Sequence, residues 1–209
     1  AFVTYIWINP VTERMYDRER LDSFLEENGF TRVYCREDWG AAVRKKYLQL
    51  ADQVSAETAE AVADVRCPAV KELLKKMDHP GLVVPEIEPI LLHCAREIGG
   101  RRDLLGSKKV IITPCGALAE AGNRLGLPET EFLPWNRFLK NLGAEFPGKR
   151  LESSPVPPGF FGCLKETDAV TGPEAVERYL REKRWRGGKM VEFLYCEGGC
   201  HSGDGVTEL

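Results

Sequence analysis

Short runs of β-branched and aromatic residues alternate with stretches of helical periodicity along this chain, and no segment repeats another. This alternation constrains the fold most strongly, because it is typical of α/β proteins in which small sheets are flanked by helices. The expected strands are 3–8, 32–35, 110–113 and 190–195. The expected helices are 17–28, 41–53, 68–77, 89–98, 117–125, 135–142 and 173–183.

Proline and glycine mark several of these boundaries. Pro68, Pro89 and Pro173 each fit the first position of a helix, where no amide hydrogen is needed. The stretch ESSPVPPGFFGCL, residues 152–164, is the most loop-like part of the chain and would join two lobes, line a cleft or form a surface turn. With 209 residues and 43% hydrophobic content, the chain can bury a large core in one domain of two lobes.

Charge and hydropathy exclude several classes of function. The formal net charge is −3, and 29 basic residues are interspersed with 32 acidic ones, so we expect no nucleic-acid partner and no membrane partner. No apolar run reaches the roughly 18 to 20 residues of a membrane span, which favours a soluble protein. Seven cysteines, an odd number, favour a reducing compartment and a cytoplasmic location. A start on Ala1 indicates processing, or a fragment that lacks a neighbouring domain.

Four of the cysteines share one local pattern, in which an extended or apolar run leads to the cysteine and then to proline or glycine. The segments are DVRCPAV, IITPCGAL and FLYCEGGC, and the cysteines are Cys67, Cys115, Cys196 and Cys200. Pro68 opens one predicted helix and Gly116 directly precedes another, so Cys67 and Cys115 would lie at helix N-termini, where free amides stabilise a thiolate. This arrangement favours a negatively charged centre.

Three interpretations of these thiols remain open on spacing alone. An iron–sulfur cluster matches best, because it is bulky and anionic and needs the close backbone approach that Gly198 and Gly199 allow. Zinc is the competitor, since the spacing of Cys196 and Cys200 suits it, but zinc sites usually pair two short knuckles and here the other two cysteines stand alone. The third interpretation is unliganded thiols.

Three ordered segments resemble the cysteine motifs of the [FeFe]-hydrogenase catalytic domain. They are RCPAVKELLKKMDHP, IITPCGALAEAG and MVEFLYCEGGCHSGDG, which resemble the family's Cys-Cys-Pro, Met-Pro-Cys-x-x-Lys and Glu-x-Met-x-Cys-x-x-Gly-Cys. The stretches LEENGFTRVYCREDWGAAV and FLPWNRFLKNLGAEF are also similar to family segments, so the resemblance covers most of the chain from about residue 20.

The resemblance implies a fold and a cofactor. We expect a two-lobed hydrogenase-like domain over residues 1–209, small sheets flanked by helices, with the cluster in the cleft between the lobes. It implies a [4Fe-4S] cluster, whose four thiolates match the cysteines named above. Cys200 matches the ligand that in hydrogenases also bridges to a diiron subsite, while Glu192 and Gly199 match other motif positions.

The chain departs from the family at the positions that serve the diiron subsite. Arg66 stands in place of the proton-shuttling cysteine, and Leu118 in place of the lysine that holds a cyanide ligand. Thr113 and Leu194 replace two methionines, and Glu88 precedes Pro89 where Ser-Pro is usual. The departures predict an open pocket beside the cluster, lined by Arg66, Glu88, Glu192 and His201. Arg66 would either bind an anionic small molecule there or fill the space with a salt bridge.

Four functions follow as hypotheses. The first is a one-electron redox protein, in electron transfer or redox sensing with a redox partner protein, without hydrogenase activity. The second is an enzyme that reduces a small molecule, or transfers sulfur to it, at the open site. The others are a true hydrogenase and a zinc-stabilised structural module. The remaining cysteines would form a second three-ligand site or pack in the core; they are Cys35, Cys94 and Cys163.

Overall fold

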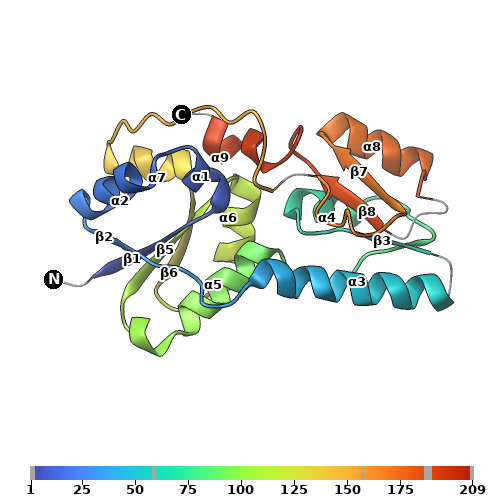
Figure 1. Ribbon diagram of the computed structural model, residues 1–209, viewed down its shortest axis with the longest axis horizontal. Helices are drawn as coiled ribbons and strands as arrows, with labels where there is room; N and C mark the ends of the chain where they lie inside the picture. Colours follow the sequence, from blue (N-terminus) through green and yellow to red (C-terminus); the bar gives the residue numbers. More distant parts are fainter. Residues whose placement is uncertain (1–2, 58–59, 157, 186–189, 208–209) are drawn as a thin grey trace. The chain divides into compact units, whose positions relative to one another are not determined.

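The structure, a computed structural model, describes residues 3–57, 60–156, 158–185 and 190–207. The chain divides into two compact units (Figure 1). Unit 1 comprises Ala1–Glu37, Leu91–Val156 and Cys200–Leu209, and unit 2 comprises Asp38–Ile90 and Pro157–Gly199. The chain therefore passes between the units after Glu37, Ile90, Val156 and Gly199. The third passage falls within the loop-like stretch 152–164.

Unit 1 is built on a parallel sheet of four strands in the order β2-β1-β5-β6. Its strands are β1 (Thr4–Ile8), β2 (Phe30–Arg32), β5 (Lys108–Thr113) and β6 (Thr130–Pro134). Its helices are α1 (Pro10–Arg14), α2 (Arg18–Glu27), α5 (Ile90–Gly100), α6 (Gly116–Asn123), α7 (Trp135–Leu142) and α9 (Asp204–Thr207), with 3-10 turns η1 (Arg102–Leu104) and η2 (Cys200–Ser202). Helix α5 begins with the last residue of unit 2.

Alternation along the strands of unit 1 directs side chains to two faces of the sheet. Ile6 and Ile112 lie in one buried cluster with Trp135 and Phe138 of α7. Figure 1 shows α1, α2 and α7 on this side and α5 and α6 on the other. On the second side Gly122 of α6 lies so close to Phe132 that a side chain there would overlap the ring. The strands are therefore covered on both faces, as parallel sheets require.

Unit 2 holds a second parallel sheet of four strands, in the order β4-β3-β8-β7. Its strands are β3 (Ala61–Ala63), β4 (Leu82–Val83), β7 (Thr167–Thr171) and β8 (Met190–Leu194). Its helices are α3 (Trp39–Glu57), α4 (Pro68–Leu74) and α8 (Pro173–Glu182). Every residue of β8 is buried, because α4 and α8 pack against one face of the sheet and α3 against the other (Figure 1).

The α/β class with small sheets flanked by helices is confirmed. The predicted strand 32–35 is wrong in position, since β2 spans Phe30–Arg32, although the amide of Val33 still donates to the Ile6 carbonyl at 2.9 Å. Strands β3, β4, β6 and β7 were not predicted, and two of them are only two or three residues long, too short to show periodicity. Among the described residues, no helix is both long and apolar enough to cross a bilayer.

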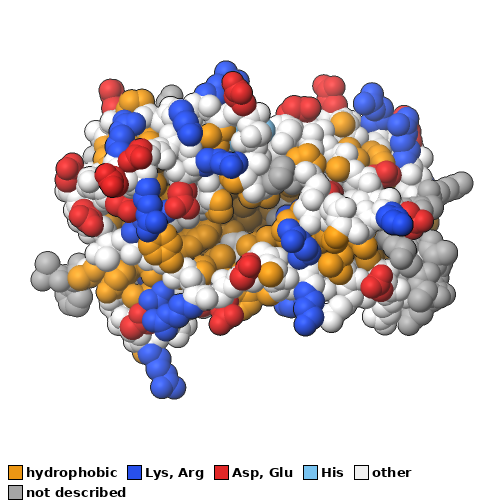
Figure 2. Space-filling view, in the orientation of Figure 1, with side chains coloured by type: hydrophobic (Ala, Val, Ile, Leu, Met, Phe, Trp, Pro, Cys, Tyr) orange, Lys and Arg blue, Asp and Glu red, His pale blue; other side chains and the backbone are white. Residues whose placement is uncertain are grey.

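Basic and acidic side chains are interspersed on both units on the side drawn in Figure 2, so no large patch of one charge lies there.

The parallel order of the strands has a further consequence for each sheet. The carboxyl ends of all four strands meet at one edge, where α/β proteins usually place their functional residues. Cys115 follows β5, and Cys67 and Cys196 follow β3 and β8.

Candidate metal centre

Cys67 is the N-cap residue of α4, in extended backbone geometry with φ −91° and ψ 113°. Pro68 opens the helix and fixes the direction in which the cysteine enters it. No conventional capping bond closes on the thiol, yet the amides of Val70, Tyr195 and Ala69 are directed toward the sulfur. Burial raises the pKa of the Cys67 thiol, and these three amides oppose the rise by favouring the thiolate.

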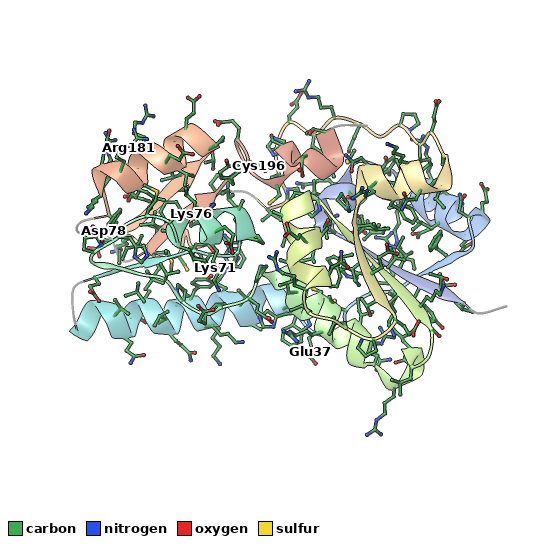
Figure 3. All side chains as sticks on the ribbon, turned by 180° about the vertical axis from the view of Figure 1, so that it is seen from behind. Glu37, Lys71, Lys76, Asp78, Arg181 and Cys196 are labelled. Carbon is green, nitrogen blue, oxygen red and sulfur yellow. The ribbon has the colours of Figure 1, made fainter. Side chains whose placement is uncertain are left out.

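Cys196 follows β8 and is labelled in Figure 3. A tight turn begins at this residue, because the amide of Gly199 donates to the Cys196 carbonyl at 3.2 Å. Gly198 (φ 69°) and Gly199 (φ 126°) both have positive φ, which side-chain-bearing residues rarely adopt. The amide of Gly198 also donates to the Thr171 hydroxyl at 3.1 Å, which anchors the turn to the end of β7. The glycines are therefore required by the turn itself.

Cys67 and Cys196 follow neighbouring strands of one sheet. Strand β3 pairs with β8, and the pairing continues past β3, since the amide of Asp64 donates to the Val191 carbonyl at 2.8 Å. The amide of Tyr195, the residue before Cys196, points at the Cys67 sulfur. Unit 2 therefore brings these two cysteine-bearing segments together at the carboxyl edge of its sheet.

Cys115 is the N-cap residue of α6, again in extended geometry, with φ −154° and ψ 161°. The Thr113 hydroxyl donates to its carbonyl at 2.8 Å, which holds the strand-to-helix turn closed. The first free amide of the helix, that of Gly116, donates to the carboxylate of Asp204 at 2.9 Å. A negative charge is thus already bound at the N-terminus of α6, beside the cysteine.

Cys200 begins the turn η2 and packs against the core of unit 1. The residues just after it lie against the segment before Cys115, since the amide of Gly205 donates to the Pro114 carbonyl at 3.1 Å. A side chain on Gly203 or Gly205 would overlap that carbonyl, so close approach requires glycine at both positions. Unit 1 therefore brings the segments of Cys115 and Cys200 together.

The donor set fits a thiolate-bound centre in its chemistry. All four predicted ligands are free cysteines and each is partly exposed. They are held two in each unit, and within residues 3–57, 60–156, 158–185 and 190–207 no three His, Cys, Asp or Glu side chains converge on a single ion. What each unit provides is a pair of cysteine segments with nearby amides and glycine turns.

Arg66, next to Cys67, belongs to a buried ion cluster in unit 2 rather than to an open site. Its guanidinium donates to both carboxylate oxygens of Asp64, with Nη2 to Oδ2 at 2.7 Å and Nε to Oδ1 at 2.9 Å. The same Nη2 lies 3.5 Å from Oε1 of Glu192. Asp64, Arg66 and Glu192 are only 0%, 7% and 1% exposed. Burial would lower the pKa of Arg66, but Asp64 and then Glu192 raise it, so the guanidinium is charged.

Glu192 also holds the segment that follows the third passage between the units. Its carboxylate accepts the amide of Gly159 at 2.8 Å and that of Phe161 at 3.3 Å. The Phe160 ring stacks on the Arg66 guanidinium, whose central carbon lies 3.9 Å from the ring centroid. Burial raises the pKa of Glu192, and the charge of Asp64 adds to that rise, against the Gly159 amide and Arg66. The guanidinium of Arg66 thus pairs with the buried carboxyl groups of both Asp64 and Glu192.

The other two predicted pocket residues, Glu88 and His201, are far apart in the sequence and belong to different units. Glu88 is half-buried in the segment between β4 and α5 of unit 2. His201 is half-buried in η2 of unit 1, with Nε2 3.5 Å from the Ser202 hydroxyl. Within unit 1 a cavity of about 940 Å³ opens beside Gly116 and Asp204, but none of the α7 residues that line it was among the predicted site residues; they are Asn136, Arg137, Leu139 and Lys140.

Three further residues that depart from the diiron pattern have structural roles. Thr113 is fully buried and bonds the Cys115 carbonyl. Leu118 and Leu194 are 8% and 3% exposed and belong to the buried cores of their units. None of these three side chains offers a ligand to a second metal group.

Sequence reasoning missed Asp64, Tyr47 and the role of Asp204. Tyr47 accepts the amide of Val65 at 3.0 Å, and burial followed by the charge of Asp64 raises its pKa. The available signal was an acidic residue two positions before Arg66, directly after the apolar run AVA, which places a carboxylate at the end of a buried strand. The Asp204 contact left no signal in the local sequence, since 88 residues separate it from Gly116.

Comparison with models of known protein families and with curated proteins gives no match for this chain.

Proposed function

We propose that this protein binds one [4Fe-4S] cluster through four thiolates and works as a one-electron redox protein, in electron transfer or redox sensing with a protein partner. The ligands are Cys67, Cys115, Cys196 and Cys200. The observation that carries the proposal is that each unit brings two cysteine segments together, those of Cys67 and Cys196 in unit 2 and those of Cys115 and Cys200 in unit 1, with three of these cysteines following strands at the carboxyl edges of parallel sheets. When bound, the cluster would supply reversible one-electron oxidation and reduction.

The chain's own residues would stabilise the anionic group through the backbone. The amides of Val70, Tyr195 and Ala69 point at the Cys67 sulfur and oppose the rise in its pKa that burial causes. The turn at Gly198 and Gly199 keeps side chains away from the ligand loop. Only three residues separate Cys196 from Cys200, so the chain itself limits the distance between the Cα atoms of these two ligands, one in each unit, to at most about 14 Å. These features support a bulky, thiolate-bound anion.

Hydrogenase chemistry is not part of the proposal. Arg66 cannot relay a proton, because its guanidinium is held charged by Asp64 and Glu192. Leu118 and Leu194 are core residues without donor atoms. The enzymatic alternative needs an arginine that can bind an anionic substrate, and the paired, 7% exposed side chain of Arg66 argues against that use.

The deciding experiment is iron and acid-labile sulfide analysis of anaerobically prepared protein, with electron paramagnetic resonance after dithionite. We expect about four irons and four sulfides per chain and a signal that appears on reduction. One zinc per chain without sulfide would overturn the proposal. Infrared bands of iron-bound carbonyl or cyanide would instead restore the hydrogenase interpretation.

A matched pair of variants tests the ligand assignment. Cys115→Ser is expected to lower the iron content by at least half, because a neutral hydroxyl replaces one thiolate. Cys163→Ser, at an exposed cysteine outside the ligand set, is expected to leave it unchanged. Unchanged iron in Cys115→Ser, measured on protein whose circular dichroism matches the parent, would remove Cys115 from the site.

A further inference from the structure

Two cysteines outside the proposed ligand set lie against each other in unit 1. Cys35 follows β2 and is partly exposed, whereas Cys94 lies in α5 and is only 6% exposed. The thiol of Cys94 donates a hydrogen bond to the sulfur of Cys35, and the indole N–H of Trp7 approaches the same sulfur. The earlier expectation of core packing therefore holds for Cys94 but is wrong for Cys163, which is exposed and belongs to unit 2.

Hydrogen bonds to the residues on both sides of Cys35 hold it in contact with Cys94. Glu97 accepts the amides of Arg36 at 2.7 Å and of Glu37 at 3.2 Å. Arg101 donates to the Tyr34 carbonyl at 2.9 Å. Cys94 and Glu97 are three residues apart and share one face of α5, and Arg101 directly follows the end of that helix. The helix and the residue after it therefore hold the backbone on either side of Cys35, and α5 presents the second thiol to it.

We propose that Cys35 and Cys94 form a redox-active dithiol, which low-molecular-weight disulfides convert to an intramolecular disulfide. Cys35 attacks one sulfur of the reagent, so that a mixed disulfide forms and one reagent thiolate leaves. Cys94 then loses its proton and attacks the Cys35 sulfur, and the second reagent thiolate leaves. The two protein thiols lose two electrons and two protons in total, and the reagent is reduced to two thiols.

The environments of the two thiols divide these roles. The hydrogen bond from Cys94 lowers the pKa of Cys35, against burial and the charge of Glu97. The same bond, together with burial, raises the pKa of Cys94 above its usual range. The more exposed thiol is therefore the better thiolate, which makes Cys35 the attacking group and Cys94 the resolving group.

In the sequence, Cys35 and Cys94 lie on either side of the first segment of unit 2. Cys35 lies just before the passage at Glu37, and Cys94 lies just after the passage at Ile90. A disulfide would join the two ends of the entire first segment of unit 2, Asp38–Ile90, on the side of unit 1. Oxidation would thus close a loop of about 60 residues, which removes freedom from the unfolded chain.

The test treats the purified full chain with glutathione disulfide under native conditions and maps tryptic peptides by mass spectrometry without reduction. Cleavage after Arg32, Arg36, Lys76 and Arg96 leaves each of the two cysteines alone, in peptides 33–36 and 77–96. We expect these peptides to be joined. Cys94→Ser should instead accumulate one glutathione on peptide 33–36, and Cys35→Ser should leave peptide 77–96 unmodified.

A second measurement uses the parent protein, in which both Cys35 and Cys94 are present. In the reduced parent protein, iodoacetamide should alkylate Cys35 at least about tenfold faster than Cys94. Cys163→Ser is the control and should give the same joined peptides. A stable glutathione adduct on Cys35 of the parent without joining to 77–96, or equal alkylation of both thiols, would overturn the proposal.

Discussion

Each unit brings two cysteine-bearing segments together, but the strand order of the two sheets differs. Each has four parallel strands with its first two strands as neighbours, but the last strand of unit 1, β6, lies at an edge of its sheet, whereas the last strand of unit 2, β8, lies inside. In unit 2 the two cysteines therefore follow adjacent strands, and their segments lie side by side. In unit 1 only Cys115 follows a strand, and Cys200 arrives through a C-terminal segment that packs on Pro114.

The cysteine pairs of the two units therefore depend on different interactions. The unit 2 pair rests on strand pairing and on a buried ion cluster beneath it, which is sensitive to charge. The unit 1 pair rests on glycine-to-backbone contact, which is sensitive to volume. Substitutions of charge and of volume should therefore affect the two units differently.

The largest effect is expected in unit 2, for Arg66→Met. Removal of the guanidinium leaves the carboxyl groups of Asp64 and Glu192 buried without their cation. We expect the free energy of unfolding in urea to fall by about 3–5 kcal/mol. Arg44→Met is the control, because Arg44 also stacks on Phe160 but is exposed, and it should change that value by about 0.5 kcal/mol or less. Equal losses would contradict a role for the buried ion cluster.

A smaller effect is expected in unit 1, for Gly203→Ala. The added methyl group meets the carbonyl oxygens of Pro114 and Cys200, which are backbone atoms that cannot swing away. We expect a loss of about 1–3 kcal/mol in the free energy of unfolding, together with lower iron content. Gly100→Ala, where nothing lies within 4 Å of the added methyl, should be neutral. An unchanged Gly203→Ala protein would show that the C-terminal segment docks by other contacts.

The smallest effect concerns how stability changes with pH. The pKa of Glu192 is raised by burial in the folded state, so folding favours its protonated form. This contribution is full below the ordinary glutamate pKa of 4.5 and is lost as pH rises through the raised folded value. Glu192→Gln should therefore flatten the decline in stability above pH 4.5, whereas Glu174→Gln, at an exposed position, should keep the parent slope. Parallel curves for Glu192→Gln and the parent would contradict the assigned shift.

The predicted helices were close to the observed ones because their signals are local. Trp135–Leu142 was predicted at its observed bounds, since an apolar face recurs at helical spacing and Gly143, with φ 63°, ends the helix. Strand β4, only Leu82–Val83, carries no such pattern and exists because β3 offers it a pairing edge. Likewise the salt bridge of Arg66 was one of two predicted roles, but its pairing with Glu192 depends on the position of β8 beside β3.

The amino-acid sequence by itself determined the α/β class, the positions of most helices and the four cysteines that carry the proposal, because periodicity, proline and glycine act over a few residues. Which segments come into contact follows only from the three-dimensional packing. The contact of Cys35 with Cys94, the hydrogen bond from the amide of Gly116 to Asp204 and the approach of Arg66 to Glu192 all join residues from separate segments. Such contacts arise from packing and strand order, and no local pattern encodes them.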